Sequence, residues 1–143
     1  MKIISKDFAY EGRIPSKFTC KGKDVNPSLI IKDIPKKAKS LALIMDDPDA
    51  PAGTFVHWVV FNIPIISQIK ENSSPGTLVE NDFKKKEYGG PCPPSGIHRY
   101  FFKLYALDVM LKLKENPSKE DIEIAMVGHI LEEAVLIGLV EKE

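Results

Sequence analysis

The sequence predicts a mainly β domain with one helix near its C-terminus, and three observations support this. Apolar and β-branched residues recur with period two or in short continuous runs, as they do in strands. Eleven prolines in 143 residues favour turns and sheet edges over long helices. Only the segment after residue 117 has the period of an amphipathic helix. A chain of this length with 43% hydrophobic residues suits a single domain, 1–143, built from two packed sheets.

Charge and cysteine content narrow the function classes. Lys and Arg number 20 and so do Asp and Glu, and a formal net charge of zero argues against a nucleic-acid-binding protein. No apolar run approaches the length of a membrane span, so we expect no stable membrane insertion. The first residues contain no hydrophobic signal core, which predicts a cytoplasmic location. Cys20 and Cys92 form no metal-binding pair, and in a reducing compartment we expect free thiols rather than a disulfide.

Three strands are predicted in the first 45 residues. Residues 1–4 and 29–31 are short β candidates. Residues 40–45 form a continuous apolar run, which indicates a buried central strand. This run ends in a proline-rich turn, where the following proline holds Asp47 in an extended conformation. In an extended chain Asp47 and Asp49 point to the same side.

Residues 55–61 form the next predicted strand. Period two places His57 on the same face as Phe55, with Trp58 on the opposite face, where we expect it to be a core residue. The pattern weakens over residues 67–87, which we interpret as a polar surface excursion and the most mobile region of the chain.

We predict that residues 89–96 form a rigid loop, followed directly by a strand that begins with a histidine. Three glycines and three prolines lie between Gly89 and Tyr100, and this composition excludes a helix. From Gly90 to Pro94, only Gly90 and Cys92 keep a backbone N–H that can donate to a ligand.

The strand predicted after this loop covers residues 98–108. His98 and Tyr100 share one face of it, and Arg99 lies on the other face, where a structural role is expected.

The C-terminal region changes period. Ser118 and the acidic residues after it resemble a helix N-terminus with a capping box. A helical stripe runs from Ile122 to Ala134, and Gly128 is expected to divide or bend it. We predict a final strand over residues 135–140.

Polar residues gather at the ends of the three strongest strands, and they predict an anion site. They are Asp47, Asp49, His57, His98 and Tyr100. If these strands are neighbours, two imidazoles, a phenol and backbone N–H groups converge into a site that suits phosphate, sulfate or carboxylate. A carboxylate such as Asp47 would fix the tautomer of a neighbouring histidine.

Structural roles for the same residues stay open. His57 alone is as consistent with a satisfied strand histidine, and Asp49 with capping the turn or pairing with Arg99. His129 stands alone on the predicted helix, where we expect a structural role. Ser95 lacks the G-x-S-x-G context of a serine hydrolase. Two histidines and one carboxylate also permit a metal-dependent hydrolase, although their spacing matches no known metal motif.

Two long motifs, at this spacing, resemble the phosphatidylethanolamine-binding protein family. The first is Asp47-Pro48-Asp49-Ala50-Pro51 followed by His57-Trp58 and Asn62-Ile63-Pro64, and the second is Gly89-Gly90-Pro91-Cys92-Pro93-Pro94-Ser95-Gly96-Ile97-His98-Arg99-Tyr100. The chain is most similar to the short bacterial and archaeal branch, called Raf kinase inhibitor-like. Phe18-Thr19-Cys20 and Gly128-His129-Ile130-Leu131 also fit that branch.

The resemblance implies a Greek-key β-sandwich with a small anion pocket at one edge. It implies that Asp47, His57, His98 and Tyr100 line the pocket and that Cys92 and its neighbouring prolines form a wall, and Asp49 and Pro51 also match motif positions. Phospholipid headgroups and other phosphate-type groups are the family's ligands, and microbial members are often dimers, so a homodimer is an open alternative. The sequence ends soon after the predicted helix, unlike longer eukaryotic members, and an open pocket favours a small anion or a phosphorylated partner over a buried lipid.

The resulting hypothesis is a non-enzymatic binding protein for phosphate-type anions, with no cofactor, no metal and no catalytic residue. The alternative, which rests on the resemblance alone, is an inhibitor of a serine protease or of a kinase pathway, with that enzyme as a protein partner.

Overall fold

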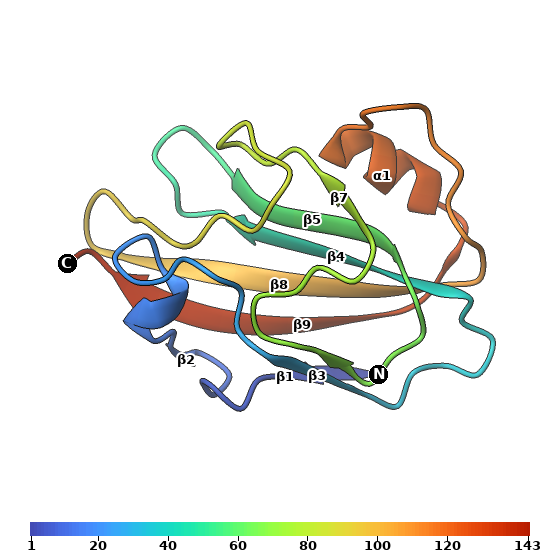
Figure 1. Cartoon of the computed structure of the whole chain (residues 1–143), viewed down its shortest axis with the longest axis horizontal. Coiled ribbons are helices and arrows are strands. Elements are labelled where there is room, and N and C mark those ends of the chain that lie inside the picture. The colour runs from blue at the N-terminus through green and yellow to red at the C-terminus, as the bar shows by residue number, and fades with distance from the viewer.

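A computed structural model describes all residues 1–143, and Figure 1 shows it as a β-sandwich with one α-helix. In chain order the elements are β1 (Lys2–Ile4), β2 (Gly12–Arg13), the 3₁₀ helix η1 (Ser16–Phe18), β3 (Leu29–Lys32), β4 (Ser40–Asp47), β5 (Phe55–Ile63), β6 (Gln68–Ile69), β7 (Thr77–Val79), β8 (Ile97–Leu107), α1 (Lys119–Met126) and β9 (Ile130–Glu141).

The strands form two sheets. The larger sheet has the order β2-β9-β8-β4-β5-β7, and the smaller has the order β1-β3-β6. All neighbours are antiparallel except β2 and β9, which run parallel. The long strands β4, β5, β8 and β9 form the centre of the larger sheet, so the fold depends mainly on pairings between distant parts of the chain.

Two apolar cores cover the two faces of the larger sheet. On one face Leu41, Leu43 and Met45 of β4 pack in a core that also contains residues of the smaller sheet. On the other face Ala42 and Ile44 pack in a core that includes residues of α1. This two-sided burial explains why residues 40–45 read as a continuous apolar run rather than an alternating one.

Most predicted elements are confirmed, but the helix is shorter than predicted. The stripe from Ile122 to Ala134 does not stay helical, because α1 ends at Met126 and β9 begins at Ile130. Gly128 has φ +81°, a left-handed conformation that reverses the chain between the two elements. The last part of the stripe then pairs with β8, with Ala134 opposite Leu104. The N-terminus is as predicted: Ser118 and Asp121 form a capping box.

A β-bulge in β5 corrects the predicted faces of that strand. Met45 pairs with Trp58 and Asp46 pairs with Val56, so His57 is an extra residue without a partner on β4. Trp58 therefore packs in the same core as Tyr100, and the ring of His57 also lies against Tyr100, 5.2 Å between centroids. The prediction that His57 and Trp58 lie on opposite faces is wrong, because one extra residue shifts the alternation.

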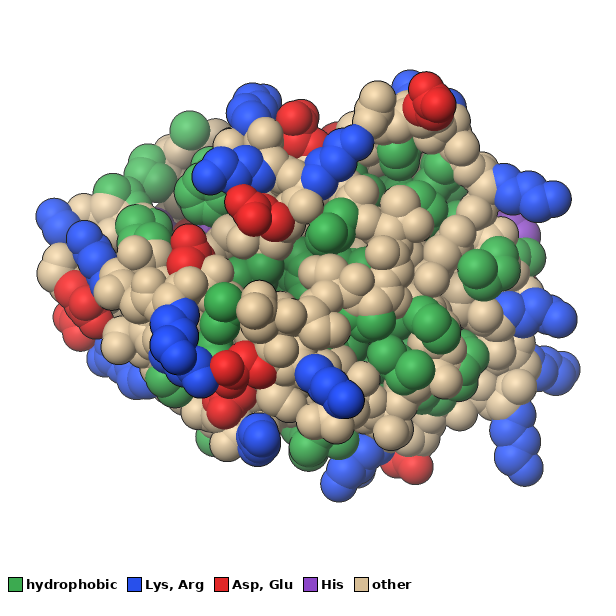
Figure 2. Space-filling view, in the orientation of Figure 1, with side chains coloured by type: hydrophobic (Ala, Val, Ile, Leu, Met, Phe, Trp, Pro, Cys, Tyr) green, Lys and Arg blue, Asp and Glu red, His purple; other side chains and the backbone are tan.

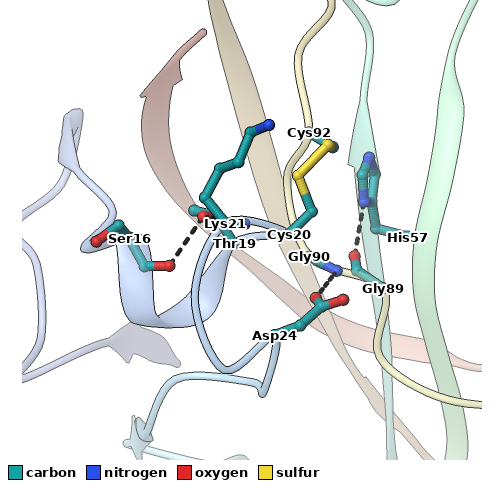
Figure 3. The surroundings of a disulfide bond; sticks show 9 residues. All are labelled: Ser16, Thr19, Cys20, Lys21, Asp24, His57, Gly89, Gly90 and Cys92. Carbon is teal, nitrogen blue, oxygen red and sulfur yellow. Dashed lines mark hydrogen bonds between the residues drawn. A yellow bond between two sulfur atoms is a disulfide. The ribbon is translucent and has the colours of Figure 1, made fainter. Parts of the chain in front are cut away.

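The two cysteines form a disulfide, and the expectation of free thiols is wrong. Cys20 and Cys92 are 72 residues apart in sequence, and their Cα atoms lie 5.5 Å apart. Folding brings the segment after η1 against the loop before β8, a juxtaposition that sequence spacing does not encode. The bond joins the loop after η1 to the loop before β8 (Figure 3), with Cys92 exposed and Cys20 half-buried.

The surface carries both signs of charge. In Figure 2, acidic and basic side chains are interspersed over much of the visible face, and hydrophobic side chains are exposed between them. None of the helices has the length and apolar character that crossing a membrane requires.

Candidate functional site

A cavity of about 280 Å³ lies where β4 ends and β5 and β8 begin, at the left of the larger sheet in Figure 1. Its lining combines ionisable and apolar side chains: Asp47, Ala50, Pro51, Phe55, His57, Phe83, Cys92, Pro94, His98 and Tyr100. Six of the seven residues predicted for the site are among them, and Asp49 is not. The neighbouring positions of β4, β5 and β8 in the sheet bring these strand ends together.

His98 and Asp47 form a buried pair on the floor of the cavity. Nδ1 of His98 lies 2.6 Å from Oδ2 of Asp47, and both side chains are less than a tenth exposed. The other carboxylate oxygen, Oδ1, accepts a hydrogen bond from the Asp49 backbone N–H at 2.8 Å. Because Asp47 accepts at Nδ1, the Nε2 atom of His98 is the nitrogen that remains for a ligand.

His57 is held from the opposite side by the loop before β8. Its Nδ1 lies 2.7 Å from the Gly89 carbonyl oxygen, which only accepts, so Nδ1 carries the proton and donates. The Gly89 N–H in turn donates to the His57 carbonyl at 2.9 Å. Figure 3 shows the second ring nitrogen turned away from Gly89. Burial lowers the pKa of His57 below its ordinary value, which the Gly89 contact and the nearby Asp47 charge only partly offset.

Tyr100 supplies a buried hydroxyl that makes no hydrogen bond of full geometry, although the Asp47 carboxylate and the Cys92 N–H lie next to it. The side chain is fully buried, yet its Oη is one of only two buried side-chain polar atoms that have no partner. Burial raises the pKa of this hydroxyl above its ordinary value, and the charge of Asp47 raises it further, so it stays protonated. Because an unpaired buried hydroxyl is costly, its persistence at a cavity wall is typical of a binding site.

The loop at residues 89–96 offers one backbone donor rather than the two predicted. The Gly90 N–H donates to Oδ1 of Asp24 at 2.7 Å and is therefore occupied. A side chain at position 90 would collide with that carboxylate oxygen and would lie 2.7 Å from the Phe18 carbonyl oxygen, which explains the glycine. The Cys92 N–H donates to no backbone acceptor, and the Tyr100 hydroxyl is its polar neighbour at the cavity.

Asp49 has a structural position at the rim. Its carboxylate accepts two hydrogen bonds from the Arg99 guanidinium, at 2.8 and 2.9 Å, and a third from the Arg99 backbone N–H at 2.9 Å. The side-chain hydrogen bond with Arg99 lowers the pKa of Asp49 to about 2. This ion pair holds the turn after β4 against the start of β8. Pairing with Arg99 is one of the structural roles that the sequence left open for Asp49.

Aromatic residues that sequence reasoning missed form the rim of the cavity. Phe55 and Phe83 lie edge-on to one another at 4.8 Å, and each lies within 5.3 Å of the His57 ring. Strand parity already placed Phe55 beside His57, so a signal for it existed. Phe83 lies in the polar segment that shows no periodic pattern. The side chain of Asn81 holds this segment in place, because it forms hydrogen bonds with the His57 carbonyl and with the backbone of its own loop.

Comparison with known proteins agrees with this geometry. Residues 4–141 match the family model described as phosphatidylethanolamine-binding protein. The chain belongs to the phosphatidylethanolamine-binding protein family. It is 51% identical to a UPF0098 protein of Methanothermobacter thermautotrophicus, with 97% of each chain aligned. A UPF0098 protein of Pyrococcus abyssi is 45% identical over all of this chain and 86% of its own length.

Solved structures of the phosphatidylethanolamine-binding protein family have the same fold. A crystal structure of a putative family homologue from Chlamydia trachomatis superposes with a TM-score of 0.95 at 39% identity, covering 99% of this chain and 97% of that one. Escherichia coli YbcL, described as a member of the mammalian family, gives a TM-score of 0.90 at 25% identity and covers 99% and 98%.

The polar groups of this family member are already partly used in hydrogen bonds within the protein. The structure contains no cluster of three or more His, Cys, Asp or Glu side chains placed to hold a metal ion. Both carboxylate oxygens of Asp47 are already hydrogen-bonded, one to His98 and one to the Asp49 N–H. The arrangement places two imidazoles, a phenol and a backbone N–H around the cavity, a set of groups that can bind an oxyanion once the imidazoles donate.

Proposed function

We propose that this protein is a non-enzymatic binding protein whose pocket takes a phosphate-type anion carried on an organic group, such as a phospholipid headgroup or a phosphorylated partner. The observation that carries the proposal is Tyr100, a residue of the cavity wall whose buried hydroxyl makes no hydrogen bond of full geometry within the protein. A ligand oxygen would accept from this hydroxyl and remove the cost of leaving it unpaired.

The two histidines determine the charge of the ligand that fits. With His57 neutral, its Nε2 is an acceptor, so an anion binds there either by bringing a proton or by drawing one from solvent. His98 contacts the Asp47 carboxylate through Nδ1, so its Nε2 is the ring nitrogen left for the anion. We infer that binding at His57 is accompanied by proton uptake, after which its imidazolium donates a charge-assisted hydrogen bond to the anion.

The rim supports an organic phosphate over a free inorganic one. Phe55, Phe83 and Pro51 line the cavity outside the polar floor, together with Pro94 and Ala50. These apolar groups offer a surface to the carbon atoms that carry the phosphate, whereas inorganic phosphate would leave this surface unused.

Tyr100→Phe tests the proposal, because it removes one oxygen and nothing else. We expect the affinity for phosphoethanolamine, measured by titration calorimetry, to fall about tenfold or more, since a hydrogen bond to a charged group is lost. We also expect the free energy of unfolding in urea to stay level or rise, because the free protein has no partner for this hydroxyl.

Tyr105→Phe is the matched control. Tyr105 lies on the same strand but on the opposite face of the sheet, outside the cavity. Its loss should leave phosphoethanolamine affinity unchanged. Equal affinity in Tyr100→Phe and the parent protein, or no binding by the parent at millimolar ligand, would refute the proposed site.

A further inference from the structure

The disulfide occupies a wall of the proposed anion pocket. Cys92 lines the cavity together with His57 and Tyr100 and is exposed, whereas Cys20 is half-buried. Both cysteines also line a neighbouring hollow of about 220 Å³. An external thiol therefore has a route to the bond, and the more exposed cysteine belongs to the pocket wall.

The stretch between Pro91 and Gly96 has no other anchor. On its N-terminal side the loop is fixed by the Gly90 N–H to Asp24 and by the Pro91 carbonyl, which accepts from the Cys20 N–H at 3.1 Å. On its C-terminal side the next hydrogen bond is the one from the Lys142 N–H to the Gly96 carbonyl at 2.9 Å. Between these points residues 92–95 make no hydrogen bond of full geometry, so the disulfide is the one covalent tether of this stretch.

We propose that the Cys20–Cys92 disulfide is a thiol-exchange site through which dithiol reductants switch the anion pocket from a tight to a weak binding state. This proposal rests on the proposed function of the pocket. The core of the sandwich does not depend on the bond, because it joins two surface loops outside both apolar clusters.

The exchange reaction balances with two thiols. The thiolate of one thiol attacks the Cys92 sulfur, a mixed disulfide forms there, and Cys20 leaves as a thiolate that takes up a proton. Lys21 follows Cys20 in the sequence, so a positively charged residue is the immediate neighbour of the leaving group. The second thiol of the reductant attacks the mixed disulfide, forms its own disulfide and releases Cys92, so the protein gains two electrons and two protons.

We expect reduction to weaken binding, because the loop that carries the Cys92 N–H is then no longer held by a covalent bond. The Cys92 N–H and the Pro94 ring would then have to be ordered when the anion binds. Fixing the backbone of a single residue costs about a factor of ten in affinity, so we expect the reduced protein to bind at least about tenfold more weakly.

The experiment compares phosphoethanolamine titrations of the oxidised protein and of protein reduced with dithiothreitol. A mass increase of about two hydrogens confirms the state, and near-ultraviolet circular dichroism checks that the reduced protein is folded. Cys20→Ser/Cys92→Ser is the control, since it lacks the bond permanently. It should bind as weakly as the reduced protein, and dithiothreitol should not change its affinity.

The outcomes separate this proposal from the proposed function. Equal affinity in the folded oxidised and reduced forms would overturn the redox proposal and leave the pocket assignment intact. Global unfolding on reduction would also overturn it, because the bond would then support the whole domain. Binding by neither form would overturn the proposed function, and the redox proposal with it.

Discussion

At the scale of the residue, the polar groups of the pocket use only some of their hydrogen-bonding atoms within the protein. His98 is held by Asp47 and His57 by the Gly89 carbonyl, each through Nδ1. The Tyr100 hydroxyl makes no hydrogen bond of full geometry, although Asp47 and the Cys92 N–H lie close to it. These contacts fix ring orientation and leave the remaining polar atoms to the cavity, an arrangement that costs stability unless a ligand completes it.

The depressed pKa of His57 predicts a pH dependence of anion binding. Burial keeps the free ring neutral near pH 7, and an anion at Nε2 favours the protonated ring, so binding raises the pKa of His57. By linkage, affinity rises as the pH falls from neutrality towards the pKa of the free ring, which burial lowers below its ordinary value. Sulfate suits the measurement because it does not itself titrate in this range.

His57→Gln provides the control, because it keeps a polar side chain without a titrating ring. We expect this variant to lose most of the increase in sulfate affinity at low pH. An affinity in the parent protein that is flat across this range, or that increases with pH, would contradict the role given to His57.

At the scale of the element, irregularities place the functional groups. The bulge at His57 leaves that residue outside the β4 ladder, so its carbonyl is free to accept from the Gly89 N–H and the Asn81 amide. The loop before β8 has few backbone donors, and the disulfide supplies the rigidity that hydrogen bonds do not. The strand ends, the bulge and the disulfide-bonded loop therefore meet at one end of the central strands of the sheet.

The disulfide also predicts a stability cost. Cys20→Ser/Cys92→Ser should lower the free energy of unfolding by roughly 4 kcal/mol, because the bond closes a long loop in the unfolded chain. Urea denaturation without reductant measures this loss, and the parent protein in dithiothreitol should give the same value. A loss below about 1 kcal/mol would show that the loop entropy is not what the bond removes.

At the scale of the whole molecule, the sequence predicts the sandwich well, because its apolar patterns are long and consistent. The run at residues 40–45 is a central strand buried on both faces, and the alternation in β8 places His98 with Tyr100 as expected. The β-bulge in β5 was not predictable, because no local sequence pattern marks the extra residue at His57.

Contacts between distant segments also escaped prediction. The pairing of Cys20 with Cys92 spans 72 residues, and the compartment argument pointed the other way. Phe83 reaches the pocket from a segment without periodicity, through the loop that Asn81 closes. The helical stripe beyond Gly128 is overridden because pairing with β8 buries the same apolar residues in a sheet.

The most direct test of the anion pocket follows the three histidine rings by nuclear magnetic resonance during a phosphoethanolamine titration. His57 and His98 line the cavity, whereas His129 pairs with Asp108 at 2.9 Å outside it and serves as an internal control. We predict saturable shifts of the His57 and His98 ring signals at millimolar ligand, with His129 unmoved. Signals of His57 and His98 that stay fixed, or three histidines that shift alike, would contradict the pocket assigned to this protein.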